Sequence, residues 1–232
     1  MSDCQVFRHD SPQGVSVRGY LHRPEPGWKD TGGTDPGGKD GLVLTHGAGA
    51  NCQAPLLVAL ARVFCASGFT VLRCDLPFRQ ARPHGPPPRG SAERDQQGLR
   101  LAVECMRGLT PTHVFLGGHS YGGRQASMLA ADEPGIAAAL LLLSYPLHPP
   151  QRPEELRTAH FSRLETPALF VHGVRDGFAT SDELAAAVRL IPASTRILSV
   201  LAAGHELLSK KNSDSLPENI VRAFRSLTGA SG

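Results

Sequence analysis

A Gly-His-Ser-Tyr-Gly sequence at residues 118–122 constrains the fold of this 232-residue chain more than any other segment. A short apolar run at 113–116 comes before it, and a stretch compatible with a helix follows at 124–131. A strand that turns sharply into a helix at Gly-x-Ser-x-Gly holds the serine in strained backbone with its hydroxyl exposed. A side chain in place of either glycine would collide with the neighbouring strand or helix. The pattern predicts that Ser120 is a nucleophile; the alternative is a plain glycine-rich turn.

Two further polar residues follow predicted strands later in the chain. Asp176 comes after an apolar strand at 167–173, and His205 comes after a strand at 196–201. In open sheets of parallel strands, catalytic and ligand-binding groups gather in the loops at the carboxyl ends of the strands. The order serine, acid, histidine is one of the orders in which catalytic triads occur. We therefore predict that His205 is the base that activates Ser120 and that Asp176 orients this base.

Other acids and histidines lie near these positions in the sequence. Asp182 and Glu183 are alternatives for the acid, but they fit the first turn of a predicted helix at 182–190, where acids suit the helix dipole. Glu206 adjoins the histidine, and we expect its side chain to point away from it. His172 lies inside a predicted strand, and we expect it to be structural.

Small residues follow another apolar strand, in a His-Gly-Ala-Gly-Ala-Asn sequence at 46–51. The backbone of such a loop can approach a substrate carbonyl closely. Strand–helix turns of this kind bind an oxyanion through the N–H of the residue after the nucleophile and through one N–H of such a loop. We therefore predict oxyanion-hole donors at Tyr121 and Ala48, with Gly47 as the next choice for the second donor. The alternative is a glycine-rich turn that leads into a helix at 55–66.

Five more residues are expected near the same site. They are His46, His119, His148, Arg79 and Arg124. If Arg79, Arg124 and His148 face one cleft, they would favour a substrate with an acidic acyl group or a phosphate. The alternative is that Arg124 braces the turn after the nucleophile and that Arg79 is solvated.

The composition argues against several other classes of protein. The net charge of +3 is small, and the scattered arginines have no aromatic motif beside them, so we expect no nucleic-acid partner. The longest apolar run, at 136–143, is too short to span a bilayer. No signal peptide is evident, and the five cysteines show no metal-like grouping. We therefore expect a cytoplasmic protein with free thiols, with no metal or cofactor, and the oligomeric state is not predicted.

Strands alternate with helices along most of the chain, which predicts one α/β domain over 1–232 with a mostly parallel, doubly wound sheet. Strands are expected at 15–22, 41–45, 70–74, 113–116, 137–144, 167–173 and 196–201, and helices at 55–66, 91–106, 124–131, 154–160, 182–190 and 217–227. Loops are expected at 24–40 and 77–90, with Ser91 as the cap of its helix. Because only residues 145–166 separate two of the strands, there is no room for a large cap domain, and the site should be open.

Four sequence strings resemble the α/β-hydrolase superfamily and, within it, the dienelactone-hydrolase-like group. They are LTHGA at 44–48, FLGGHS at 115–120, YPLHPP at 145–150 and LFVHG at 169–173. The chain resembles the small lidless branch that contains testis-expressed hydrolase-like proteins and a chromatin-complex subunit. The resemblance implies an α/β-hydrolase fold and a triad of Ser120, Asp176 and His205. This branch usually carries arginine and methionine where the chain has His119 and Tyr121, a departure that bears on specificity.

These observations predict a serine hydrolase that forms an acyl-enzyme, with a small carboxylic ester as its substrate. A thioesterase or peptidase on the same scaffold is the first alternative. The second is a non-catalytic binding or scaffold protein that keeps the fold. The intact set of predicted catalytic parts argues against this second alternative, because a vestigial site is free to lose any of them.

Overall fold

The computed structural model describes residues 3–24, 40–110 and 112–229, so the loop expected at 24–40 lies almost wholly outside the described residues. The strands are β1 Asp3–Asp10, β2 Ser16–Arg23, β3 Gly41–Thr45, β4 Thr70–Asp75, β5 Val114–His119, β6 Leu140–Leu143, β7 Ala168–Gly173 and β8 Thr195–Val200. The helices are α1 Pro55–Ala66, α2 Pro77–Ala81, α3 Ala92–Arg107, α4 Tyr121–Asp132, α5 Ser181–Val188 and α6 Ser215–Thr228, with a 3-10 turn η1 at Phe161–Arg163.

The strands form one eight-stranded sheet in the order β1-β2-β4-β3-β5-β6-β7-β8. β2 pairs antiparallel with both β1 and β4, and every other pair of neighbours is parallel. The predicted mostly parallel α/β sheet is therefore confirmed. Parallel strands all end at one edge of a sheet, so the loops after β3, β4, β5, β6, β7 and β8 share the carboxyl edge.

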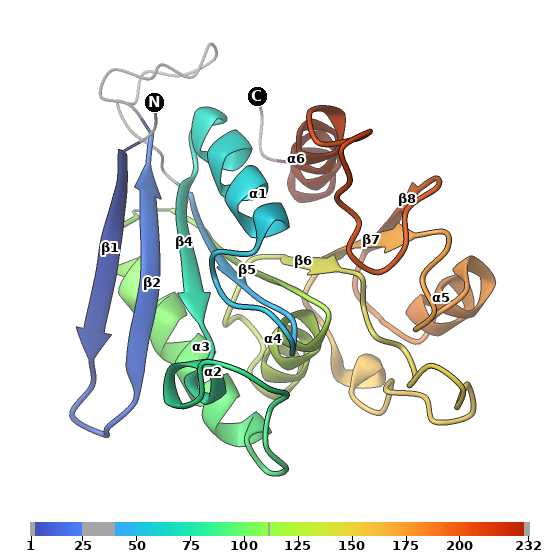
Figure 1. Ribbon diagram of the computed structural model, residues 1–232, viewed down its shortest axis with the longest axis horizontal. Helices are drawn as coiled ribbons and strands as arrows, with labels where there is room; N and C mark the ends of the chain where they lie inside the picture. Colours follow the sequence, from blue (N-terminus) through green and yellow to red (C-terminus); the bar gives the residue numbers. More distant parts are fainter. Residues whose placement is uncertain (1–2, 25–39, 111, 230–232) are drawn as a thin grey trace.

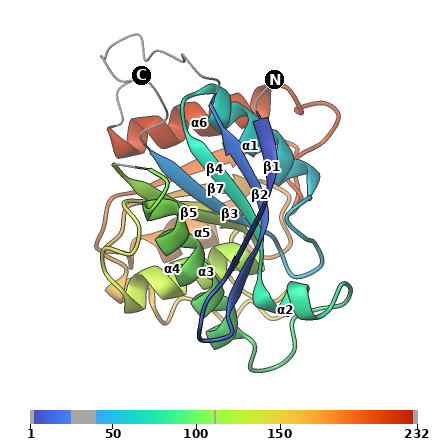
Figure 2. The same cartoon turned by 90° about the vertical axis from the view of Figure 1, so that its left-hand side faces the viewer.

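Helices cover both faces of this sheet. α1 and α6 lie together on one face, and α3 and α4 lie on the other (Figure 1), as Figure 2 also shows from the side. Successive residues of a strand point to opposite faces, so a strand that is covered on both sides is apolar throughout. In β6, Leu140 and Leu142 join the core under α3, α4 and α5, whereas Leu141 and Leu143 join the core under α1 and α6.

Two elements were missed by the sequence patterns. β1 was not predicted because its residues do not alternate and mostly face solvent, with Val6 65% exposed. α2 occupies the start of the segment that we expected to be a loop. It begins at Pro77, where a missing N–H costs nothing, and the Phe78 N–H donates to the Asp95 carboxylate at 2.9 Å.

Other expectations were wrong in detail. No helix forms at 154–160; the segment is made of turns, because the Arg157 N–H donates to the distant carbonyl of Leu147 at 2.8 Å. Ser91 precedes α3, but its hydroxyl makes no capping hydrogen bond and lies 3.4 Å from the hydroxyl of Tyr121. The expected lack of a large cap domain, in contrast, is confirmed: between β6 and β7 the chain has only η1.

Candidate active site

Ser120 is the residue between the end of β5 at His119 and the start of α4 at Tyr121. Its φ of 49° and ψ of −115° are unfavourable for a residue with a side chain. The turn is held because the Ser120 N–H donates to the carbonyl of Leu143 at 2.8 Å and the Arg124 N–H donates to the carbonyl of Ser120 at 3.0 Å. The strain therefore belongs to a conformation that the neighbouring strand and helix impose on the serine.

The two motif glycines allow this turn to pack. A Cβ atom at Gly118 would lie 2.6 Å from the backbone carbon of Gly122, and one at Gly122 would lie 2.5 Å from the carbonyl oxygen of His46. Real Cβ atoms do not approach backbone so closely, so a larger residue at either position would displace the turn. The steric reason that the sequence suggested for the Gly-x-Ser-x-Gly spacing is present in the structure.

The three predicted triad side chains meet at the carboxyl edge of the sheet. The Nε2 atom of His205 lies 2.8 Å from the Ser120 Oγ atom, and Nδ1 lies 2.9 and 3.0 Å from the two carboxylate oxygens of Asp176. The Asp176 side chain is fully buried, whereas that of His205 is 22% exposed. With Nδ1–H donating to Asp176, the lone pair of Nε2 faces the serine hydroxyl and can accept its proton.

Three neighbours hold His205 in this position. Its carbonyl accepts hydrogen bonds from the Ser144 Oγ at 2.6 Å and from the His119 Nε2 at 2.9 Å. The ring of Phe178 covers the imidazole at a centroid distance of 4.3 Å, and the Phe178 N–H donates to Asp176 at 2.9 Å. His119, which was expected near the site, contacts the backbone of His205. Ser144 and Phe178 were missed, although both follow strand ends.

The other acids and histidines have different partners. Glu183 forms a capping box with Thr180 at the start of α5 and lies 3.4 Å from His148 Nε2. His148 also contacts the carbonyl of Pro149 through Nδ1 at 2.8 Å. His172 is fully buried in β7, and neither ring nitrogen has a hydrogen-bond partner among the described residues. Burial lowers the pKa of His172 and keeps it neutral.

The loop after β3 lies against the elbow. A Cβ atom at Gly47 would be 3.0 Å from His119 Nδ1 and 3.4 Å from the Cβ of Ser120, so this loop reaches Ser120. The N–H of Tyr121 is the first of α4, and the first N–H groups of a helix have no partner within it. The backbone of Tyr121 and that of Gly47 in the 46–51 loop thus both lie next to Ser120.

Arg79 of α2 holds this loop rather than facing solvent. Its Nη2 donates to the carbonyl of Ala48 at 2.7 Å and to that of Gly85 at 2.9 Å, and its Nε donates to the carbonyl of Ala50 at 2.7 Å. The remaining nitrogen, Nη1, donates to the carbonyl of Arg82 at 3.1 Å. Arg79 is only 5% exposed, and all three nitrogens of its guanidinium donate to backbone carbonyls. The structure therefore gives it a supporting position instead of the substrate contact that we expected.

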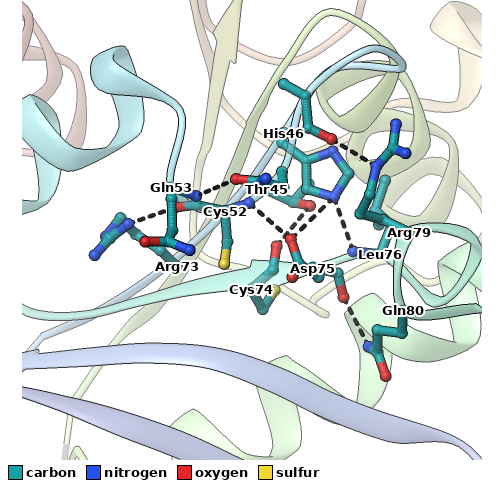
Figure 3. Close-up of polar contacts among 12 residues, drawn as sticks. Thr45, His46, Cys52, Gln53, Arg73, Cys74, Asp75, Leu76, Arg79 and Gln80 are labelled. Atoms are coloured by element: carbon teal, nitrogen blue, oxygen red, sulfur yellow. Dashed lines mark hydrogen bonds and ion pairs between the residues drawn. The ribbon is translucent and has the colours of Figure 1, made fainter. Parts of the chain in front are cut away.

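His46 is likewise engaged by backbone. Its Nδ1–H donates to the carbonyl of Gly47 at 2.8 Å, and its Nε2 accepts from the Leu76 N–H at 3.1 Å. The carboxylate of Asp75, beside this ring in Figure 3, accepts from the N–H of Cys52 at 2.7 Å. Burial lowers the pKa of His46. His46 and Asp75 thus join the ends of β3 and β4, and both His46 nitrogens are used within the protein.

A buried acid supports Tyr121, the residue after Ser120. Asp95 of α3 is fully buried and accepts from the Tyr121 hydroxyl at 2.7 Å and from the Phe78 N–H at 2.9 Å. Burial raises the pKa of Asp95 above its usual value, and its hydrogen bonds oppose that rise. Asp95 thus links the start of α4 to α2, the helix that carries Arg79, and this link was not predicted from the sequence.

Within residues 3–24, 40–110 and 112–229, no group of three histidine, cysteine or acidic side chains is arranged to hold a metal ion. None of the helices in these ranges is both long and apolar enough to cross a membrane.

A mostly parallel sheet with a serine at the strand–helix turn defines an α/β-hydrolase. Residues 38–229 match the alpha/beta hydrolase domain family, and the chain belongs to that family.

Solved structures share this fold over nearly their whole length. Est1E from Butyrivibrio proteoclasticus is 17% identical, with a TM-score of 0.74, 97% of this chain covered and 99% of that chain. An α/β serine hydrolase without lid from Xanthomonas campestris is 17% identical, with a TM-score of 0.75 and coverages of 99% and 97%. Dienelactone hydrolase from Anabaena variabilis is 18% identical, with a TM-score of 0.70 and coverages of 97% and 98%. At such identities the likeness shows a common fold.

Proposed function

We propose that this protein is a serine hydrolase that cleaves small carboxylic esters through an acyl-enzyme. The observation that carries the proposal is the continuous hydrogen-bonded path from the Ser120 hydroxyl through His205 to the buried carboxylate of Asp176, with distances of 2.8 and 2.9 Å. A serine hydroxyl becomes a useful nucleophile when an adjacent base takes its proton, and a third group must hold that base in the right tautomer.

In the proposed reaction, Ser120 Oγ attacks the ester carbonyl carbon while His205 accepts the hydroxyl proton. The tetrahedral oxyanion accepts hydrogen bonds from the N–H groups of Tyr121 and Ala48, with Gly47 as the alternative second donor. When the intermediate collapses, His205 gives its proton to the departing alcohol. Water then attacks the acyl carbonyl carbon while His205 takes a proton from it. When this second tetrahedral intermediate collapses, the bond to Ser120 Oγ breaks, His205 returns the proton to Ser120 Oγ, and the carboxylic acid leaves.

The carboxyl edge favours a small or surface-presented ester. No cap domain stands between β6 and β7 to enclose a long acyl chain. The similar structure from Xanthomonas campestris is described as a serine hydrolase without lid, which supports this reading of the site. Thioesters and peptides remain alternatives, because the same triad and oxyanion donors serve all acyl transfers.

The cysteines support a cytoplasmic location, which we also propose. Cys4, Cys52, Cys74 and Cys105 are free thiols, and Cys52 and Cys74 are buried. Burial raises the pKa of Cys52 to about 12, so this thiol, near the 46–51 loop, is not a competing nucleophile at neutral pH.

Steady-state hydrolysis of 4-nitrophenyl butyrate, its thioester and its anilide tests the proposal. The wild type and Ser199→Ala, an exposed serine on β8, should hydrolyse the oxygen ester fastest, and Ser120→Ala should lose about 10⁵-fold or more in kcat. Retained hydrolysis by Ser120→Ala would contradict the assignment. Faster turnover of the thioester or anilide would contradict the carboxylesterase assignment and favour the thioesterase or peptidase alternative.

A further inference from the structure

A second group of polar side chains lies beside the elbow. It consists of Arg124 and Ser127 of α4 with Tyr145, Arg157 and His160 of the segment after β6, and we call it the arginine cluster. The Tyr145 hydroxyl donates to the carbonyl of Arg157 at 2.8 Å, and Ser127 Oγ lies 2.8 Å from His160 Nε2. The first contact holds the segment after β6 to itself, and the second fixes that segment against α4.

The arginine cluster adjoins the nucleophile. The Ser120 N–H donates to Leu143, the last residue of β6, at 2.8 Å, and Tyr145 follows directly after Ser144. Helical side chains tilt toward the amino terminus of their helix, which for Arg124 is the end that carries Ser120. The charge of Arg124 acts on the phenol groups of both Tyr121 and Tyr145, which lie at this end. Arg124 therefore lies one helical turn after Ser120, and its N–H donates to the Ser120 carbonyl at 3.0 Å.

The arginine cluster contains two half-buried positive charges, those of Arg124 and Arg157. The Nε atom of Arg124 is buried and has no hydrogen-bond partner in the described part of the chain. Arg157 is half-buried, and its Nη1 donates to the carbonyl of Pro146 at 3.2 Å. Burial and then the nearby charge of Arg124 lower the pKa of Arg157. Like charges held together away from bulk water repel each other, and a neighbouring anion would relieve that repulsion.

The acids of the surrounding segments bind other arginines, although the charge of Glu155 also reaches Arg157 and acts to raise its pKa. Glu155 binds Arg152 at 2.7 Å, and Asp132 binds Arg163 at 2.8 Å. His160 adds no further charge at neutral pH, because burial and Arg124 lower its pKa to about 4.

We infer that Arg124 and Arg157 form a subsite for an anionic group of the substrate, a carboxylate or a phosphate. This inference rests on the proposed function: the anion occupies the arginine cluster while the ester carbonyl lies at Ser120. A guanidinium offers a planar fork that binds either anion through two hydrogen bonds, and two such forks favour a charged chain end over an apolar one. Arg79 and His148, which the sequence grouped with Arg124, use their nitrogens on backbone and on Glu183 instead.

A matched pair of esters tests the subsite. The wild type should hydrolyse 4-nitrophenyl hydrogen adipate with a kcat/KM about 10-fold above that for 4-nitrophenyl hexanoate, after subtraction of the spontaneous reaction. Arg124→Gln and Arg157→Gln should each lower this adipate-to-hexanoate ratio by about 10- to 100-fold. Arg163→Gln, an exposed arginine nearby, should leave the ratio unchanged. Equal rates on both esters in the wild type, or equal losses on both in Arg124→Gln, would overturn the inference and leave Arg124 as a brace.

Binding without turnover separates this inference from the proposed function. Adipate or inorganic phosphate should raise the Tm of Ser120→Ala, and the rise should vanish in the double variant Ser120→Ala/Arg124→Gln. If neither anion raises the Tm of folded Ser120→Ala, the subsite does not exist. If the rise is present but the wild type hydrolyses no ester, the subsite stands and the proposed function fails.

Discussion

At the scale of single residues, the conformation of Ser120 depends on Gly118 and Gly122, because a side chain at either position would collide with neighbouring backbone. A Cβ at Gly122 would lie 2.5 Å from the His46 carbonyl oxygen and 2.6 Å from Thr45 Cγ2. We predict that Gly122→Ala lowers the free energy of unfolding by about 1–3 kcal/mol, because the turn must shift. Urea denaturation should show this loss, and Gly108→Ala, whose Cβ would have an ordinary 3.4 Å contact, should be nearly neutral. Equal effects of the two substitutions would contradict the packing argument.

The identity of the acid is also decided by single residues. Asp176 lies on His205, whereas Asp182 is exposed in the first turn of α5. We predict that Asp176→Asn lowers kcat for 4-nitrophenyl butyrate by about 10⁴-fold, because the amide favours the wrong tautomer of the base. Asp182→Asn should keep wild-type kcat in the same assay. Full activity in Asp176→Asn together with its loss in Asp182→Asn would reverse the assignment.

At the scale of elements, α2 supports the loop that we assign to the oxyanion hole. Arg79 ties the carbonyls of Ala48 and Ala50 to this helix, and a lysine cannot reproduce that fork. We predict that Arg79→Lys lowers kcat by about 10- to 100-fold with a small change in KM, since the second oxyanion donor loses its position. Arg82→Lys, on the exposed segment after α2, is the control. A rise in KM with unchanged kcat would instead indicate that Arg79 binds substrate.

The elements differ in how far the sequence could predict them. The elbow and the apolar strands were predictable, because local motif and local hydrophobicity determine them. α2 was missed, since its start depends on a hydrogen bond from Phe78 to Asp95 of another helix. The helix expected at 154–160 does not form, because the backbone of Arg157 bonds to the segment after β6. Contacts between elements, which no local pattern records, account for both errors.

At the scale of the whole molecule, the candidate site is assembled where strands end. The order of Ser120, Asp176 and His205 in the chain, each after a predicted strand, was enough to predict that they lie together. In the structure His205 is within hydrogen-bond distance of both Ser120 and Asp176. Ser144 and Asp95 were not foreseen, because their role depends on which strand or helix lies beside the elbow. Arg79 and His46 were expected at the substrate and support the loop instead, since burial leaves their nitrogens to the backbone.

Buried neutral histidines make the stability of the whole fold depend on pH. Burial lowers the pKa of His22 and of His160 to about 4, whereas both would titrate near 6.5 in the unfolded chain. Between pH 4 and pH 6.5 the unfolded chain binds more protons at these two histidines than the folded protein does. The contribution of the neutral histidines to the free energy of unfolding is therefore fully present above pH 6.5 and is lost as the pH falls toward 4. We predict that His160 contributes about 1–2 kcal/mol to the loss of stability between pH 7 and pH 5.

Urea denaturation at pH 7 and at pH 5 measures this loss. His160→Gln cannot titrate and should reduce the difference between the two pH values, whereas His84→Gln, on the exposed segment after α2, should not. A wild type with the same free energy of unfolding at both pH values would contradict the prediction.

The central claim is that the fold holds an activated serine at position 120. Its most direct test is to treat the purified protein with a fluorophosphonate, follow the intact mass and map the modified peptide. We predict one adduct, on Ser120, which forms in the wild type and in Ser199→Ala and is absent from Ser120→Ala and strongly slowed in His205→Ala. No adduct on the folded wild type, or an adduct on another residue, would contradict the claim and favour a binding or scaffold role for this hydrolase fold.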